Sequence, residues 1–592
     1  MKGKIDDKNI KKIKILIIVV VILLIIWFLV VSPLIKFKNS EKQVLEAAKR
    51  YYEINNSLLP TGKKIRTVSL QTLYDKDLIS EDLKSPYTNK ECNSKTSWAK
   101  VRKENNEYKY YVYLECGILS SKIDHKGPEI TLKDGDTVTI NKGDTYKDAG
   151  IKSVIDDTDG NIDIKKVTID SSKVNTNKNG TYEVTYKVRD SFNNETVKIR
   201  TVKVEQILNK IVEKDTDKTN IYKGSNSGVA IRVDGIIFDV VGVNDDGSIK
   251  VVSNENVLFA DYNSVDKVLD DFYNNLSDEV KEYIETNSKW CDEKVSDIAN
   301  YKKCNDYSKK KPIGLLSVAD INNSYDSDGI SWITSAGEFW TSNSFNSKQI
   351  SSSHSIGLAD YSKDKIMGIR PTLNIKKNTK IISGTGTYNN PYIFEKIKQS
   401  VGSEISNLRI GEYINYSGYN WRVSSKDSDN NVKLVMTDVI GNPDNGVFET
   451  TYSSKNENYN PNSKNNIGYK INNEVSSYIS GNNFMKHNVE VKNYKNKVSY
   501  DSDATSKTYK SRLSLISIFD YFSSNNNTVK YWYKEHTTND EKTYVKIPNY
   551  GVDAEKYNNS NYAIKLVGYI NGDYKIKMGD GTEDNPYTLS KK

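Results

Sequence analysis

The chain has 592 residues, of which 27% are charged and 36% hydrophobic, and its formal net charge is +8. At this length we expect about three to five domains. Six lysines and two aspartates in residues 1–14 contribute half of the net charge, so the basic balance does not indicate a nucleic-acid partner.

An apolar segment near the N-terminus is the firmest element. Residues 15–31 contain no charged or polar side chain. Extended to Ile35, this segment forms a helix of about 30 Å, which matches the hydrocarbon core of a bilayer. We predict a transmembrane helix over 15–35, with 1–14 as a cytoplasmic stub because of its lysines. A cleaved signal peptide is the competing interpretation, but Pro33 directly after Ser32 fits a cleavage site poorly.

Four cysteines fall into two local pairs, Cys92 with Cys116 and Cys291 with Cys304. Outside the cell such pairs are typical of disulfides, and their loops of about 25 and 14 residues would each contribute on the order of 3 kcal/mol. Zinc is the alternative, but neither pair has a tight Cys-x-x-Cys spacing or a nearby histidine. With its histidines scattered, the sequence indicates no metal site, no cofactor and no catalytic residues.

After the apolar segment, Ser40 and Gln43 form a capping-box pattern, which predicts a new helix to residue 56. Residues 108–116 have strand character. This arrangement over 40–120 resembles type IV pilins and pseudopilins; the matching residues are Ala47, Ala48, Tyr51, Tyr52, Leu59, Pro60, 73–79, Ser85, Pro86 and Cys92. The resemblance implies a small α+β region, although the prepilin peptidase motif is absent. A membrane-proximal helical stalk with a small α+β cap is the alternative.

Residues 126–205 change to period-2 alternation, in runs at 130–132, 138–140, 181–188 and 197–204, which predicts a β-sandwich. The segments 127–132, 143–150, 156–160, 179–182 and 188–190 resemble the Ig-like repeats of Gram-positive surface proteins, which implies a spacer or adhesive role. Asp156, Asp157 and Asp159 have the ligand chemistry of calcium, but we favour a solvated acidic turn.

The C-terminal part contains a duplication. Three pairs of segments align in the same order: 234–240 with 417–423, 313–320 with 513–520, and 380–392 with 575–587. We predict two related α+β domains, 221–395 and 404–590. The first should open with a hairpin over 238–252 and continue with a helix over 265–273, for which Ser264 is the expected N-cap.

The first unit resembles a domain family of uncharacterised surface proteins of low-GC Gram-positive bacteria, through 269–276, 313–317, Trp332, Trp340 and 368–375. That layout is similar to C-type-lectin-like and formylglycine-generating-enzyme-like domains. The oxidase activity needs reactive cysteines, whereas Cys291 and Cys304 are spaced like a structural bridge. We therefore expect no enzyme. Arg370 should lie on an inner strand and hold loop carbonyl groups.

The predicted fold class is a multi-domain, mainly β and α+β protein with a single transmembrane helix. The predicted function is that of a non-catalytic, single-pass protein of the cell membrane. Its extracellular repeats should bind a cell-wall polymer, glycan or protein through exposed aromatics, for which Trp332, Trp340 and Trp532 are the candidates. The alternative is a subunit of a type IV pilus or type II secretion-like assembly.

Overall fold

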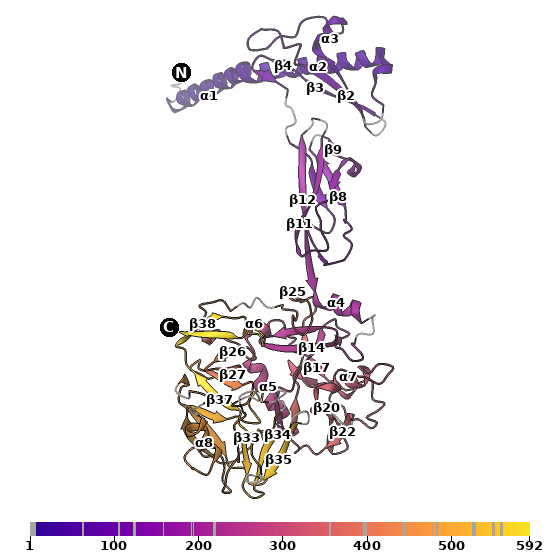
Figure 1. The fold of residues 1–592 in the computed structure, drawn as a ribbon. Helices are drawn as coiled ribbons and strands as arrows, with labels where there is room; N and C mark the ends of the chain where they lie inside the picture. Colours follow the sequence, from indigo (N-terminus) through magenta and orange to yellow (C-terminus); the bar gives the residue numbers. More distant parts are fainter. Residues whose placement is uncertain are drawn as a thin grey trace, which may run out of the picture. The chain divides into compact units, whose positions relative to one another are not determined.

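The computed structural model describes the chain outside residues 1–6, 62–63, 105–106, 122–125, 158, 191, 193, 217–220, 354–356, 395–398, 442–445, 476–477, 481–482, 524–528, 548–550 and 557–559. It forms two compact units (Figure 1). The first contains most of residues up to 202, and the second contains 203–592 with two short segments of the β-sandwich. Part of the predicted cytoplasmic stub lies outside the described residues.

The N-terminal helix is continuous through Pro33. It consists of α1 (Asp7–Ile26), the π-helical segment η1 (Trp27–Val31) and α2 (Ser32–Ile54). Proline has no N–H and its ring crowds the carbonyl four residues earlier, and the wider π turn before Pro33 relieves that conflict. The predicted new helix start at Ser40 is therefore wrong: the Ser40 hydroxyl donates to the Lys36 carbonyl (3.2 Å) within the helix.

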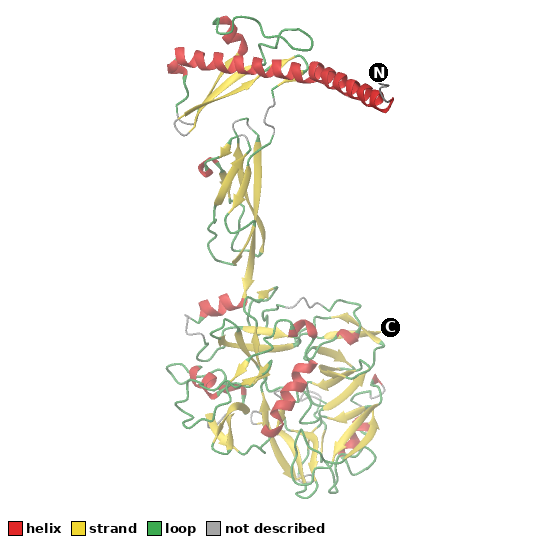
Figure 2. Cartoon of the chain, turned by 180° about the vertical axis from the view of Figure 1, so that it is seen from behind, coloured by secondary structure: helices red, strands yellow, loops and turns green. Residues whose placement is uncertain are grey.

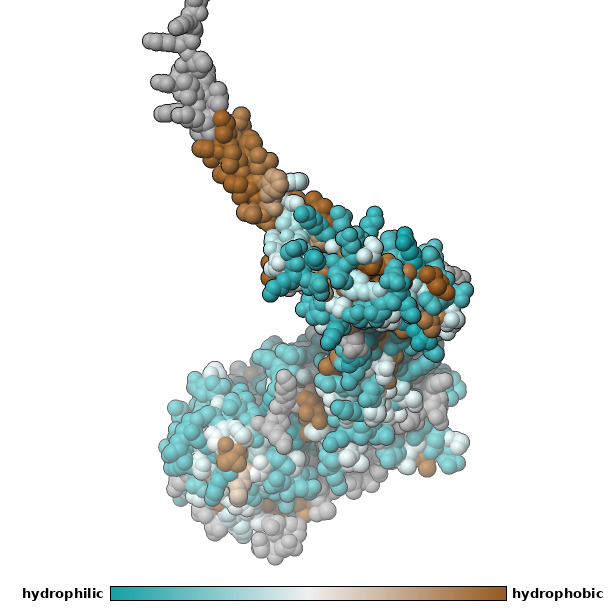
Figure 3. Space-filling model, turned by 90° about the horizontal axis from the view of Figure 1, so that it is seen from above, coloured by the Kyte–Doolittle hydropathy of each residue, from teal (hydrophilic) through white to brown (hydrophobic). Residues whose placement is uncertain are grey.

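This helix is the only one in the described residues that is long and apolar enough to cross a membrane, over Leu16–Ile54. Its first half exposes large aliphatic side chains on all sides, visible as a continuous brown surface in Figure 3. Its second half has a buried face that includes Val44, Ala48 and Tyr52. Since hydrophobic residues exposed all round are typical of a lipid-facing helix, the two halves suit different surroundings.

The second half of the helix belongs to a small α+β domain, whose other elements are η2 (Asn56–Leu58), β1 (Ile65–Ser69), α3 (Leu70–Asp75), β2 (Trp98–Glu104), β3 (Glu107–Tyr113), β4 (Glu115–Cys116) and β5 (Leu119–Ser120). Strands β1, β2 and β3 form an antiparallel sheet, and α2 packs with α3 and this sheet around one core. Ser69 caps α3 by accepting the N–H of Thr72 (3.1 Å).

The β-sandwich contains β6 (Glu129–Leu132), β7 (Thr137–Asn141), β8 (Ile151–Asp156), β9 (Gly160–Asn161), η3 (Ile164–Lys166), β10 (Thr168–Asp170), β11 (Gly180–Arg189) and β12 (Glu195–Ile207). One sheet has the order β6-β8-β9, and the other contains β10-β11-β12 with β7 also paired to β12. Every predicted run is a strand, because alternating side chains such as Val184, Tyr186 and Val188 fill the core.

The first repeat follows. Its elements are α4 (Leu208–Asp215), β13 (Ala230–Val233), β14 (Ile236–Val243), β15 (Ile249–Ser253), β16 (Leu258–Ala260), η4 (Tyr262–Ser264), α5 (Val265–Asn275), α6 (Asp278–Lys281), β17 (Lys289–Trp290), β18 (Lys309–Lys310), β19 (Ile313–Gly314), α7 (Val318–Asn323), η5 (Thr334–Ala336), β20 (Phe339–Phe345), β21 (Lys348–Ser353), β22 (Gly357–Tyr361), β23 (Met367–Ile369), β24 (Thr372–Ile375) and β25 (Lys380–Ile381). The predicted hairpin and helix are present. Ser264 precedes α5, but its side chain makes no capping bond to the helix.

The second repeat contains η6 (Ile405–Asn407), β26 (Tyr413–Tyr416), β27 (Tyr419–Lys426), β28 (Val432–Met436), β29 (Glu449–Thr450), α8 (Ile467–Asn473), β30 (His487–Lys492), β31 (Ser506–Ser511), β32 (Leu513–Leu515), β33 (Tyr531–Thr537), β34 (Lys542–Ile547), β35 (Gly551–Lys556), β36 (Tyr562–Ala563), β37 (Leu566–Ile570), β38 (Tyr574–Met578) and β39 (Tyr587–Lys591). Both repeats are dominated by strands, with short helices between them (Figure 2).

The sheets of the two repeats have the same strand order. In the first repeat the orders are β13-β14-β15-β24-β19 and β16-β23-β20-β21-β22. In the second they are β26-β27-β28-β37-β32, extended by β39 and β38, and β29-β36-β33-β34-β35. A register shift also recurs at the same place, between Val240 and Gly242 and between Val423 and Ser425. The equal strand order and the equally placed register shift indicate that the two repeats have the same fold.

Individual residues correspond as the aligned segments predict. Phe238 and Trp421 occupy the same register on β14 and β27, directly before the recurring shift. Ser317 and Ser517 each donate their backbone N–H to an aspartate three residues later, over 2.8 Å in both repeats. A Cβ on Gly384 would lie 2.0 Å from the Pro391 carbonyl oxygen, and one on Gly579 would lie 2.3 Å from that of Pro586. Both turns therefore require glycine.

The hydrophobic core of the first repeat extends into the second. Ile410, Tyr521 and Phe522 of the second repeat belong to the same buried cluster as the strands β13 to β15 of the first. The backbone N–H of Gly235 also donates to the Ile410 carbonyl (2.9 Å). Because burial is continuous across the junction, we expect the repeats to unfold together and not independently.

Candidate functional site

The three tryptophans expected to face a ligand are buried. Trp332 is 6% exposed, and Trp340 and Trp532 are both 0% exposed. Each indole N–H donates to a backbone carbonyl: Trp332 to Tyr222 (3.2 Å), Trp340 to Ala260 (3.0 Å) and Trp532 to Thr450 (2.6 Å). The prediction of exposed rings on these loops is wrong, because the indoles fill the cores of the two repeats and their only polar atom is already satisfied.

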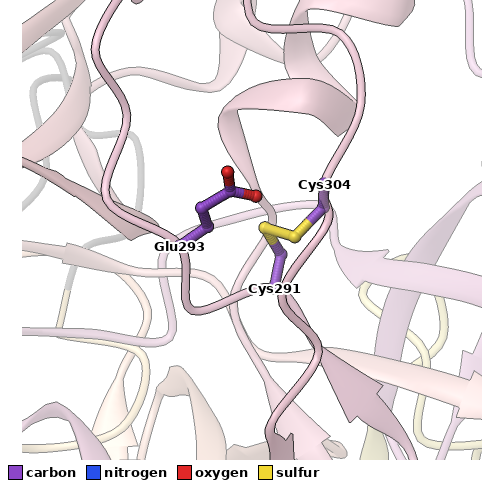
Figure 4. Close-up of side chains that lie close together, drawn as sticks. All are labelled: Cys291, Glu293 and Cys304. Atoms are coloured by element: carbon purple, nitrogen blue, oxygen red, sulfur yellow. A yellow bond between two sulfur atoms is a disulfide. The ribbon is translucent and has the colours of Figure 1, made fainter.

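Both predicted disulfides are present, Cys92–Cys116 and Cys291–Cys304. Figure 4 shows the second with the Glu293 carboxylate beside it. This carboxylate accepts the Tyr301 hydroxyl (2.9 Å) and the Asn305 N–H (2.7 Å). Sulfur atoms joined in a disulfide are not thiolates, so in the oxidised protein this cluster is a structural bridge and not a metal centre.

Arg370 is 1% exposed and lies between β23 and β24, so its predicted place on an inner strand is wrong, but its guanidinium holds carbonyl groups as predicted. Its Nε donates to the Ser253 carbonyl (2.8 Å) and its Nη1 to the Ile333 carbonyl (3.0 Å). Burial lowers the pKa of Arg370 to about 10, and Asp239 nearby opposes this shift. The guanidinium therefore ties the end of β15 to the residue before η5.

The acidic turn of the β-sandwich has the hydrogen bonding of a turn. Asp156 is 4% exposed and its Oδ1 accepts the backbone N–H of Asp159 (2.7 Å). Gly160 adopts φ +69°, a left-handed conformation that suits glycine. The predicted solvated turn is therefore wrong for Asp156 and Asp159, since both carboxylates are buried and that of Asp159 pairs with Arg102 (2.8 Å).

The two repeats enclose a cleft of about 450 Å³ at their junction. Its first wall consists of Asn254, Glu255, Tyr388 and Asn389 from the first repeat, and its second wall consists of Thr437, Asp438, Glu583 and Asp584 from the second. These are equivalent positions. The N–H of Asn254 donates to Ile237 (3.1 Å), and that of Thr437 donates to Asn420 (3.0 Å), at the same place after β15 and β28.

The buried group in this cleft is Arg422, on β27, which is 3% exposed. Its Nε donates to the Gly411 carbonyl (3.0 Å) and its Nη1 pairs with Glu255 across the junction. Its guanidinium lies 3.7 Å from the Phe522 ring centroid and 5.0 Å from that of Tyr413. Burial alone would lower the pKa of Arg422, but Glu255 raises it, so the cation is retained.

Tyrosine rings line the mouth of the cleft. Tyr388 is 55% exposed, and Tyr413 is half-buried with its hydroxyl 3.4 Å from Glu583. Burial raises the pKa of both hydroxyls, with nearby carboxylates adding to the shift, so both remain protonated at neutral pH. Tyr388 is therefore available as a hydrogen-bond donor and as an apolar face, whereas the Tyr413 hydroxyl already donates to Glu583.

Two more buried titratable groups, which are electrostatic neighbours of charged residues of the cleft, lack full partners. Glu412 is 1% exposed, its Oε1 accepts no hydrogen bond, and burial raises its pKa to about 7. Lys565 is fully buried, its Nζ has no hydrogen-bond partner, and burial lowers its pKa to about 7. Neither group lines the cleft itself.

A comparison with protein families finds one match. The family described as the Ig-like domain of bacterial surface proteins matches residues 130–204. The chain thus contains an Ig-like domain of the kind found in bacterial surface proteins, as predicted from the sequence. No curated protein matches the chain.

Sequence reasoning missed the cleft because it placed ligand binding on the tryptophan loops. A usable signal was present in the duplicated segments 380–392 and 575–587. Their glycines and prolines recur, whereas Tyr388 and Asn389 stand where the second copy has Glu583 and Asp584. A scaffold that is retained while its exposed side chains diverge is typical of a surface with a specific role.

Proposed function

We propose that this chain is a non-catalytic, single-pass cell-membrane protein with its N-terminus in the cytosol. Its extracellular repeats bind a cell-wall polymer, glycan or protein partner. Three features support the proposal: an N-terminal helix with an apolar surface, an Ig-like domain of bacterial surface proteins, and two disulfides that suit an oxidising compartment. Binding by the repeats does not depend on a lectin-like fold, because function resides in the site and not in the fold.

The observation that carries the binding role is the cleft between the repeats. It combines a concave surface, exposed tyrosine and several polar side chains that converge from two domains, which is the usual composition of a ligand site. Glu255 and Arg422 connect the two walls, so the site is held in shape before a ligand arrives.

Topology is tested first. On intact cells stripped of their wall, added protease should remove a tag placed after Lys592 but spare a tag placed before Met1. The full-length chain should remain in the membrane fraction. Release of a shortened chain by signal peptidase would replace the anchor with a cleaved signal peptide, and a protected C-terminal tag would reverse the orientation.

Binding is tested with the full chain in detergent and with purified Gram-positive cell-wall material. Asn389→Arg places a long side chain into the cleft from an exposed position, and Asn462→Arg makes the same change at an exposed position outside it. Retention should fall for Asn389→Arg alone. Appearance of new reducing ends or free amino groups in the wall material would contradict the non-catalytic part of the proposal.

A subunit of a pilus-like or secretion assembly is the second candidate. It is favoured by one observation: a single helix of which one half is apolar on all sides while the other half packs on a small disulfide-bonded sheet. In such an assembly the apolar halves pack against each other. Cysteines introduced one at a time over 16–31 should then form ladders of cross-linked chains, whereas a solitary anchor gives monomers.

A further inference from the structure

We infer that the cleft between the repeats takes a neutral saccharide. This inference rests on the proposed binding role and names the class of ligand. It depends on the lining of the cleft alone, since Trp340 and Trp532 are buried in the cores.

The charges of the lining disfavour an anionic polymer. Arg232 and Arg422 contribute two positive charges, and Glu255, Asp438, Glu583 and Asp584 contribute four negative charges. The excess of carboxylates repels an anionic polymer, whereas a polycation would leave the hydrogen-bond donors of Arg232 and of the asparagine amides without acceptors. Since Glu255 is already neutralised by Arg422, both signs remain close together along the walls. A neutral ligand is repelled by neither sign of charge.

The hydrogen-bonding groups of the lining suit hydroxyl groups. Carboxylates only accept, guanidinium groups only donate, and the amides of Asn254 and Asn389 do both. A hydroxyl group both donates and accepts, so a molecule with many hydroxyls can satisfy all three kinds of partner at once. An ammonium group only donates, and a carboxylate or phosphate diester only accepts.

The apolar part of the lining is small and largely aromatic. The Tyr388 ring is 55% exposed, and its hydroxyl lies beside the Asn254 amide, so the ring stands at the first wall of the cleft. Beyond the tyrosines, the aliphatic side chains that line it are those of Ile237 and Pro391. Protein interfaces depend on larger apolar anchors in pockets, whereas the C–H face of a sugar ring needs one flat ring to stack on.

The two walls of the cleft differ in chemistry, and this difference orients the ligand. The loops that carry Tyr388 and Glu583 are equivalent and are held by the same glycine and proline framework. The first repeat presents a ring and an amide there, and the second presents two carboxylates, Glu583 and Asp584. A saccharide should therefore stack on the first wall and donate hydroxyl hydrogens to the second.

The experiment uses the full chain in a detergent without a sugar head group. The probes are tetrasaccharides of N-acetylglucosamine, glucose, galactose and mannose, together with octalysine and polyglycerol phosphate. Tyr388→Ala removes the exposed ring, and Tyr307→Ala is the matched control because Tyr307 is 45% exposed in the same repeat but outside the cleft. Glu583→Gln tests the second wall.

At least one neutral tetrasaccharide should bind, Tyr388→Ala should weaken it about tenfold, and Tyr307→Ala should leave it unchanged. Glu583→Gln should weaken it less, because an amide still accepts. The inference is overturned if no tetrasaccharide binds, if both tyrosine variants behave alike, or if octalysine or polyglycerol phosphate binds the cleft more tightly. Wall material that is still retained in those cases leaves the proposed function standing, and loss of all binding removes both.

Discussion

The two repeats have the same sheets but treat one pair of buried positions in opposite ways. In the first, Asp239 on β14 lies near Arg370, which precedes β24. In the second, the equivalent positions carry Arg422 and Lys565, two cations. A buried cation needs a counter-charge, and the first repeat supplies one to Arg422 through Glu255. The first repeat thus provides its own counter-charge at this place, whereas the second repeat depends on the first for one.

This difference shows how a duplicated fold becomes one unit. Once a neighbour supplies Glu255, the second repeat no longer needs an acid at the position of Asp239. The ion pair between Glu255 and Arg422 also joins the two walls of the cleft. Lys565 has no such partner among the described contacts, and it contributes a cost instead.

The largest effect should follow removal of a core indole. Trp340→Ala and Trp532→Ala should each lower the free energy of unfolding by about 3–5 kcal/mol, because a fully buried side chain leaves a cavity and an unsatisfied carbonyl. Urea denaturation of the full chain in detergent measures the loss, and hydrogen exchange locates it. If the repeats share a core, protection should fall in both. A loss of protection from hydrogen exchange in the mutated repeat alone would contradict the conclusion that the two repeats unfold together.

Removing the disulfide of the first repeat comes next. The double variant Cys291→Ser with Cys304→Ser should lose about 3 kcal/mol, since it frees a loop of 13 residue steps in the unfolded chain. The corresponding change at Cys92 and Cys116 should leave exchange in the repeats unaffected, because those cysteines lie in the first compact unit. A loss of protection in the repeats after that second change would contradict the division.

The ion pair across the junction should have a smaller effect. Glu255→Gln leaves Arg422 buried without its counter-charge, and we expect a loss of about 1–3 kcal/mol, because the Glu255 side chain is itself 27% exposed. Asp438→Asn makes the same change at the equivalent, exposed position and should stay within about 0.5 kcal/mol. Equal losses in the two variants would remove the special role given to Glu255.

A last effect is a dependence of stability on pH. Burial lowers the pKa of Lys565 from 10.5 to about 7, so between these values the unfolded chain binds more protons than the folded one. The cost of Lys565 is therefore full below pH 7 and disappears as the pH rises toward 10.5. Lys565→Met should stabilise the chain more at pH 7 than at pH 10, as measured by urea midpoints. An equal gain at both values would show that folding does not lower the pKa of Lys565, as expected if a counter-charge keeps the amine protonated.

Local patterns of the sequence determined much of the fold. The apolar run near the N-terminus, the alternating strands of the Ig-like domain and the hairpin before Val265 each depend on side chains a few residues apart. The two cysteine pairs are also local, with partners 24 and 13 positions apart. Such features follow from periodicity and short loops, which a sequence displays directly.

Tertiary structure decided what the patterns could not. A helix that passes through Pro33, indoles that turn inward and the pairing of Arg422 with Glu255, 167 positions apart, all depend on which surfaces meet. Local composition marks a tryptophan as suitable for a core or for a ligand surface, and only the packed neighbours distinguish the two. The cleft exists because equivalent loops of the two repeats face each other. Sequence periodicity does not show which loops will face each other in this way.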